Sequence, residues 1–148
     1  KLTEKLKNAS LIRFATLLYM CGTKAISALC RRYRVPNDFH DLAKLTASHY
    51  VVALEAKKMT ADQLVELFGK LDIYRRPDRF LDFLIACQGI ADSLKKPFDL
   101  SWFLRCATIA QGCDVQKLIA EGFEGNELAI KIREMKVIMI DEWLKTNK

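Results

Sequence analysis

Glycine, proline and histidine are scarce in this sequence of 148 residues, which contains six glycines, three prolines and two histidines. No stretch has the composition of a flexible or proline-rich linker, and the length fits one domain of ordinary size. We therefore expect a single helical domain over residues 1–148. No uninterrupted apolar run approaches the roughly 20 residues that a membrane-spanning helix needs, so no membrane partner is expected.

Disulfide and zinc frameworks are also absent from the sequence. The five cysteines are scattered along the chain, and no two of them form a CxxC pair. Zinc ligands usually come in closely spaced pairs, and disulfide scaffolds use an even number of cysteines. We interpret them as small buried hydrophobic residues of a protein in the reducing cytoplasm: Cys21, Cys30, Cys87, Cys106 and Cys113.

The common catalytic motifs are missing as well. The sequence has no glycine-rich phosphate loop and no DxD pair that could hold two magnesium ions. A Cys–His or Ser–His nucleophile would have to use His40 or His49, the only histidines. We expect no catalytic residue, no metal site and no cofactor in this chain.

His40 and Asp41 form a doublet of the kind that binds a divalent metal in HD-type phosphohydrolases. A complete site needs further ligands, and His49, nine residues away, falls on the opposite face of a helix. A helix start capped by Asn37 or Asp38, with His40 near the surface, is the better interpretation. A divergent metal-dependent phosphohydrolase centred on this doublet is kept as a third hypothesis.

Helical periodicity runs along almost the whole chain. It predicts an all-α fold, a compact array of about seven helices with short connections. Local signals support several starts, among them Thr60 with Gln63 as a capping box, Pro77 in a first turn and Asp114 as a cap. The expected helices cover about residues 2–21, 23–34, 38–55, 60–70, 77–94, 99–111, 114–122 and 126–145. In the second of them, Ile26, Leu29, Cys30 and Tyr33 are expected to face inward.

Acidic residues are almost absent from one end of the chain. Residues 1–34 contain eight basic residues and a single acidic one, Glu4, whereas the other 114 residues contain 16 basic and 17 acidic. The net charge of the chain is +6, and its basic end suggests an anionic partner. A solvated helix surface would also account for this charge.

The candidate RNA-binding residues lie at helix ends. The planar guanidinium of arginine matches phosphate geometry, and free backbone N–H groups at a helix start also bind phosphate. The turn Gly122–Asn126 is a candidate backbone clamp for this reason, through Gly125 and Asn126. The side-chain candidates form two clusters: Arg31, Arg32 and Arg34 around Tyr33, and Arg75, Arg76 and Arg79 around Pro77. Cations that complement a helix dipole are the alternative.

Three separated strings carry a family resemblance: CRRYRVPNDFHDLAKLTASHY (Cys30–Tyr50), ELFGKLDIYRRPDRF (Glu66–Phe80) and LIAEGFEGNELAIKIRE (Leu118–Glu134). In order and spacing they resemble segments of the bacterial class II tRNA nucleotidyltransferases, the CCA-adding enzymes. The resemblance implies the helical C-terminal body and tail, which grip the acceptor and T arms of tRNA and position its 3′ end. It also implies that CMP and AMP addition, from CTP and ATP with Mg, belongs to an N-terminal head that is absent here.

The sequence departs from this family at two places. RFATLLYMCGTK (Arg13–Lys24) resembles the family's HD segment, but Tyr19 and Met20 stand at the His-Asp positions, and most of the following linker is missing. The phosphohydrolase function of HD-bearing members should therefore be lost. The segment Ala86–Pro97 also lacks acidic and arginine residues of the family pattern, which puts a local tRNA contact or packing feature in doubt.

The leading hypothesis is thus a cytoplasmic, tRNA-binding part of a CCA-adding transferase, with tRNA as its partner. The alternative is a helical protein–protein interaction module that has lost RNA binding. Such a module would need an exposed apolar patch, for which Trp102-Phe103 and the run Val137–Ile140 are candidates. No oligomeric state is predicted.

Overall fold

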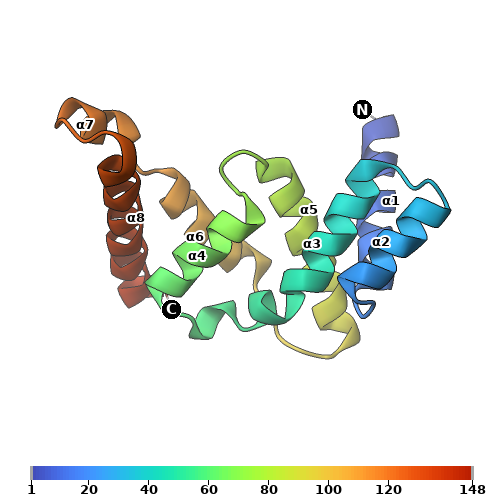
Figure 1. Ribbon diagram of the computed structural model, residues 1–148. Helices are drawn as coiled ribbons and strands as arrows, with labels where there is room; N and C mark the ends of the chain where they lie inside the picture. Colours follow the sequence, from blue (N-terminus) through green and yellow to red (C-terminus); the bar gives the residue numbers. More distant parts are fainter. Residues whose placement is uncertain (1, 148) are drawn as a thin grey trace. The chain divides into compact units, whose positions relative to one another are not determined.

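The computed structural model describes the backbone of residues 2–147 and the side chains of residues 7–147 (Figure 1). These residues form α-helices, one 3₁₀-helix and no strand, which confirms the predicted all-α fold. The elements are α1 (Leu2–Leu18), α2 (Thr23–Arg32), α3 (Asn37–Leu54), η1 (Ala56–Lys58), α4 (Ala61–Leu71), α5 (Pro77–Ser93), α6 (Leu100–Gln111), α7 (Val115–Ala120) and α8 (Gly125–Asn147). None of these helices combines the length and apolar character needed to cross a bilayer.

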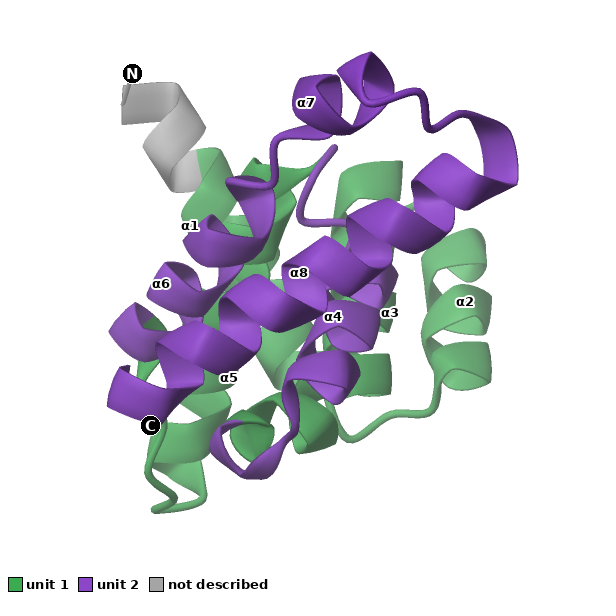
Figure 2. Ribbon diagram, turned by 90° about the vertical axis from the view of Figure 1, so that its left-hand side faces the viewer, with its two compact units in different colours: residues 1–56, 76–100 green, residues 57–75, 101–148 purple. Residues whose placement is uncertain are grey.

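The helices form two compact units, coloured separately in Figure 2. Unit 1 consists of Lys1–Ala56 and Arg76–Leu100 and contains α1, α2, α3 and α5. Unit 2 consists of Lys57–Arg75 and Ser101–Lys148 and contains α4, α7, α8 and nearly all of α6. The expected folding of the whole chain as one domain stays a prediction.

In unit 1, α3 contacts α1, α2 and α5. Ala15 on α1 and Ala43 on α3 have no exposed surface, and small side chains at such positions let two helices approach closely. Beside them the rings of Phe14 and Phe39 meet edge to face, with centroids 5.6 Å apart. Helix α5 adds Phe83, which is fully buried. This core fixes α3, and with it the start of α3 that faces α2.

In unit 2, α8 packs against α4 and α7. Phe68 and Phe103 meet at 5.9 Å between centroids, and the indole N–H of Trp102 donates to the backbone oxygen of Asn147 at 3.0 Å. Trp102 and Phe103 are 2% and 1% exposed, so the suggested apolar patch at these residues is wrong; they belong to the core. In the run Val137–Ile140, Ile138 is exposed but Ile140 is fully buried, because neighbouring residues of a helix point in different directions.

Most local start signals are confirmed. Thr60 and Gln63 form the capping box, Asp114 caps α7 through the backbone N–H of Lys117, and Pro77 opens α5. The predicted cap at Asn37 or Asp38 is wrong. Pro36 occupies the N-cap position, since its fixed φ and extended ψ already lead into α3. The carboxylate of Asp38 instead binds the ammonium of Lys7 at 2.8 Å.

Four helices end in the same left-handed turn. At the end of α2, the N–H of Arg34 donates to the carbonyl oxygen of Arg31, and the N–H of Val35 donates to the carbonyl oxygen of Cys30 at 2.9 Å. This pair of hydrogen bonds is the Schellman motif. The same pattern closes α4, α5 and α7. The left-handed residues are Arg34 (φ 50°), Asp72 (φ 53°), Lys95 (φ 54°) and Gly122 (φ 97°). Glycine is the usual residue here because a Cβ atom is strained at positive φ, so three of these turns are strained.

Candidate nucleic-acid interface

The end of α2 carries an uncompensated positive charge. Arg31 and Arg32 occupy its last turn, Arg34 follows in the left-handed turn, and all three side chains are exposed. None of them forms a salt bridge with a side chain that the structure describes. A helix C-terminus carries only about half a negative charge, so the dipole compensates a fraction of this cluster.

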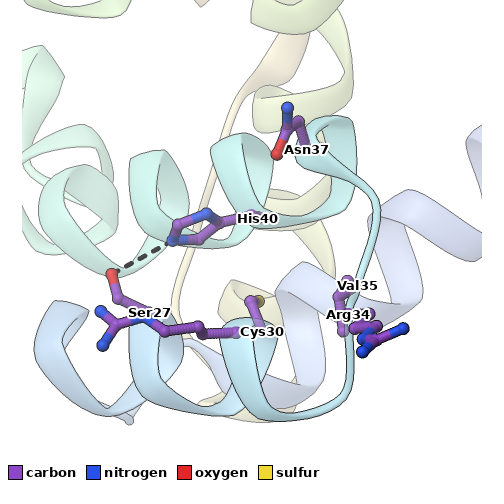
Figure 3. Close-up of a pocket in the computed structure, with 7 residues that line it drawn as sticks. Ser27, Cys30, Arg34, Val35, Asn37 and His40 are labelled. Atoms are coloured by element: carbon purple, nitrogen blue, oxygen red, sulfur yellow. Dashed lines mark hydrogen bonds between the residues drawn. The ribbon is translucent and has the colours of Figure 1, made fainter.

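Two of these arginines line a pocket of about 420 Å³ between α2 and α3 (Figure 3). Across the pocket wall, Oγ of Ser27 and Nε2 of His40 point toward one another and form a hydrogen bond of 3.1 Å. The complete lining consists of Ser27, Cys30, Arg31, Arg34, Val35, Asn37 and His40. The structure therefore adds further hydrogen-bonding groups to the cations that the sequence singled out.

The local sequence explains how the pocket forms. Ser27, Cys30 and Arg31 are spaced i, i+3 and i+4, so they follow one side of α2, and Arg34 joins them from the left-handed turn that follows the helix. Pro36 then holds the connection extended and starts α3, which places its first turn beside that side. Asn37 and His40 belong to α3 and not to this spacing, so they join the pocket only through the packing of α3 on α2, which the sequence reasoning missed.

The structure separates Arg32 from the other two arginines of its cluster. Arg32 does not line the pocket, and its guanidinium carbon lies 5.6 Å from the ring centroid of Tyr33. The expectation that Tyr33 faces inward is wrong, because its side chain is 66% exposed. Helix α2 ends at Arg32, so the helical periodicity used for that prediction does not extend to Tyr33. Ile26 and Cys30 are buried as predicted.

The second arginine cluster spans the boundary between the two units, and its residues differ in their local partners. Arg75 belongs to unit 2, whereas Arg76 and Arg79 belong to unit 1. Arg75 is bound to Asp72, with Nη2–Oδ2 3.0 Å and Nε–Oδ1 3.1 Å, and this hydrogen bond raises the pKa of Arg75. Arg76 Nε lies 3.9 Å from a carboxylate oxygen of Asp78. The charge of these two arginines is thus partly compensated.

Arg79 differs from its neighbours because it is half-buried. Its Nε atom is buried and has no hydrogen-bond partner among the described residues. Such a donor carries a desolvation cost, and its burial keeps a ligand oxygen from reaching it. The role of Arg79 in RNA binding stays a prediction.

The turn Gly122–Asn126 offers a helix start with little steric hindrance. Gly125 begins α8 with φ 58°, and a Cβ atom there would meet nothing within 4 Å. Asn126 is exposed. The acidic Glu127 lies in the first turn of α8, and Glu124 directly precedes the first residue of this helix. These carboxylates complement the positive end of the helix, so they compete with a phosphate for it.

The cysteines follow the sequence interpretation in part. Cys30, Cys87 and Cys106 are buried, and burial raises the pKa of Cys106 to about 12. Cys21 is exposed and Cys113 is half-buried, so the expectation of burial is wrong for these two. Cys21 follows the end of α1, which stops at Leu18 rather than near residue 21.

No group of three or more His, Cys, Asp or Glu side chains that could hold a metal ion occurs within the described part of the chain. In the His40-Asp41 doublet, His40 is half-buried against Ser27 whereas Asp41 is exposed. Tyr19 stands where the related family has the histidine of its His-Asp doublet. Its ring packs edge to face on Tyr50, with centroids 4.9 Å apart.

Comparison with known proteins identifies relatives of this chain. A multifunctional CCA protein of Shewanella denitrificans is 32% identical over an aligned length of 169 residues, gaps included. The alignment covers 93% of this chain and 41% of the relative. A second, from Pseudomonas fluorescens, is 34% identical over 126 residues, or 80% of this chain and 31% of the relative. The chain is a homologue of the multifunctional CCA proteins.

This homology confirms the predicted family resemblance. The chain spans less than half the length of these multifunctional CCA proteins. No family model matches the chain, and no solved structure matches it.

Proposed function

We propose that this chain is the tRNA-binding helical body and tail of a CCA-adding tRNA nucleotidyltransferase. In this proposal its helices hold the acceptor and T arms of tRNA and position the 3′ end. An N-terminal head, which uses Mg with CTP and ATP, adds CMP and AMP. The homology to the multifunctional CCA proteins supports this function.

The observation that carries the proposal is the exposed charge at Arg31, Arg32 and Arg34, which forms no salt bridge with the side chains of residues 7–147. An RNA backbone presents one negative charge for each phosphate, and arginine binds phosphate oxygens through two parallel N–H groups. Three full charges exceed what the half-charge at the end of α2 can use. The excess is available to a partner, and Arg79 is kept as a second contact candidate on its charge alone.

The test is binding to a tRNA that lacks its CCA end, measured across a salt series. The affinity should fall steeply with salt, and tRNA should be preferred over an unrelated hairpin. The triple variant Arg31→Gln, Arg32→Gln, Arg34→Gln should lower the slope of log K against log salt by about 2 to 3, since each phosphate contact contributes about 0.9.

A matched triple variant, Arg13→Gln, Arg105→Gln, Lys117→Gln, removes the same charge from scattered exposed positions. It should retain most of the slope and the preference for tRNA. Equal losses in both triple variants, or equal binding of tRNA and hairpin, would contradict the proposal, because the charge would then act without a defined site.

A protein partner is the second candidate. Leu17 and Met20, near the end of α1, are each 79% exposed, which is unusual for large apolar side chains so close together. Replacing both with Ser should leave tRNA binding unchanged if the first proposal is right. If the chain binds no tRNA, this end of α1 becomes the place to look for a partner.

A further inference from the structure

The pocket between α2 and α3 is lined by groups that suit an anion. Arg31 and Arg34 contribute two guanidinium groups, and Ser27, Asn37 and His40 contribute hydrogen-bonding groups. No carboxylate belongs to the lining, and burial raises the pKa of the Cys30 thiol, which keeps it uncharged. The pocket thus combines positive charge with hydrogen-bonding groups, and the described residues that line it include no competing anion.

The neighbouring carboxylates are directed elsewhere. Asp38, next to Asn37 in sequence, is held by Lys7 at 2.8 Å, and this hydrogen bond lowers the pKa of Asp38. Asp41 follows His40 but does not line the pocket. The two acidic residues nearest in sequence on α3 therefore leave the cations of the pocket uncompensated.

The exposure of the two arginines indicates which kind of anion the pocket takes. A free ion held by exposed guanidinium groups gains little, since exposed ion pairs contribute little binding free energy. A polymer with a phosphate at every residue binds several cations at once, and each contact raises the effective concentration of the next. The volume of about 420 Å³ also exceeds what one phosphate group needs and leaves room for the adjoining sugar.

We propose that the α2–α3 pocket takes one phosphodiester group of a bound RNA strand. Arg31 and Arg34 contact the phosphate oxygens, and the Ser27–His40 hydrogen bond holds the imidazole in the pocket wall. The choice of RNA rests on the proposed function; the choice of a phosphate rests on the lining alone. Arg32 lies outside the pocket and binds, if at all, a different phosphate.

The two histidines make the experiment selective. His40 lines the pocket and His49 does not, so the imidazole ¹H–¹⁵N spectrum contains one reporter and one internal reference. An acceptor–T-arm minihelix without CCA should shift the His40 signals and leave those of His49 in place. Dimethyl phosphate and inorganic phosphate, titrated separately, serve as diester and free-anion probes.

Variants connect the spectrum to affinity. Arg34→Gln should weaken minihelix binding roughly tenfold, the effect of losing a charged hydrogen bond, and abolish the His40 shift. The salt slope should fall by about 1. Arg13→Gln removes one exposed charge from the same unit without touching the pocket, and should change neither the affinity by more than about twofold nor the His40 shift.

The outcomes separate the two proposals. Salt-dependent binding with an unmoved His40, and with Arg34→Gln equal to Arg13→Gln, would overturn the pocket and leave the proposed function standing. A His40 response to inorganic phosphate without any to the minihelix would assign the pocket to a free anion and also overturn it. A minihelix that does not bind at all would overturn both.

Discussion

The ammonium group of Lys136 lies over the ring of Tyr74, with Nζ 3.6 Å from the ring centroid. Burial lowers the pKa of Lys136 and raises the pKa of Tyr74 to about 12. The contact joins the end of the segment after α4 to the middle of α8, within unit 2. It is one of several contacts made by polar side chains that hold α8 in place, together with Arg133–Asp62 at 2.8 Å.

The raised pKa of Tyr74 should make the free energy of unfolding depend on pH. Its folded pKa of about 12 lies above the ordinary 10.0, so its contribution to stability is complete below pH 10 and is lost as the pH rises through 12. The stability of the wild type relative to Tyr74→Phe should therefore fall between about pH 10 and 12. Urea unfolding of both proteins at several pH values measures this, and parallel curves would contradict it.

The left-handed turn at Arg34 predicts opposite effects on stability and binding. Arg34→Gly removes a strained Cβ atom, which stabilises the fold, but glycine also makes the unfolded chain more flexible. The net effect should be a rise of about 0.5–1 kcal/mol in the free energy of unfolding. The same change should weaken RNA binding. Lys95→Gly, at the equivalent turn of α5, gives the backbone effect alone. An Arg34→Gly variant that is more stable and binds RNA as the wild type does would deny Arg34 any role in binding.

A large side chain in unit 1 tests the predicted single domain. Phe83→Ala should cost about 3–5 kcal/mol, because Phe83 is fully buried, whereas Leu81→Ala on the same helix, 40% exposed, should cost less than about 1 kcal/mol. Both tryptophans, Trp102 and Trp143, lie in unit 2. If the chain is one domain, Phe83→Ala shifts the tryptophan fluorescence transition as far as the circular dichroism transition. A fluorescence transition that stays in place would mean that the units unfold separately.

Thiol labelling should separate the cysteines by environment. The exposed Cys21 should react first with iodoacetamide at pH 8. Cys87 and Cys106 should react only after unfolding, because burial raises the pKa of both thiols and shields their sulfur atoms. Mass spectrometry of peptides after timed labelling gives the order. Rapid labelling of Cys87 in the native protein would show that the contact of α5 with the rest of unit 1 opens readily.

Local signals predicted much of the fold because they act within a few residues. Thr60 with Gln63 and Pro77 mark their helices through short-range hydrogen bonding and fixed dihedral angles. The predicted cap at Asn37 was wrong because Pro36 occupies the N-cap position, although the side chain of Asn37 would suit that position. The predicted burial of Tyr33 was wrong because helical periodicity does not indicate at which residue a helix ends.

The candidate site could be predicted only in part. Arg31 and Arg34 were found from charge, and helical spacing relates Arg31 to Ser27. His40 joins them through the packing of α3 on α2, which no local pattern encodes. Arg75 and Arg76 are adjacent in sequence, but the charge pattern did not show that Asp72 would bind one and that Asp78 would lie near the other.

The left-handed turns give the chain a dependence on its ionic surroundings. At positions 34 and 95 a cation occupies a strained backbone next to the negative end of a helix. That attraction, about 0.3–1 kcal/mol in dilute salt, offsets part of the strain and fades as salt screens it. Glycine therefore becomes the better residue for folding as ionic strength rises. In a salt-rich cell, keeping arginine at position 34 would cost stability and would persist only if selection acts on something other than folding.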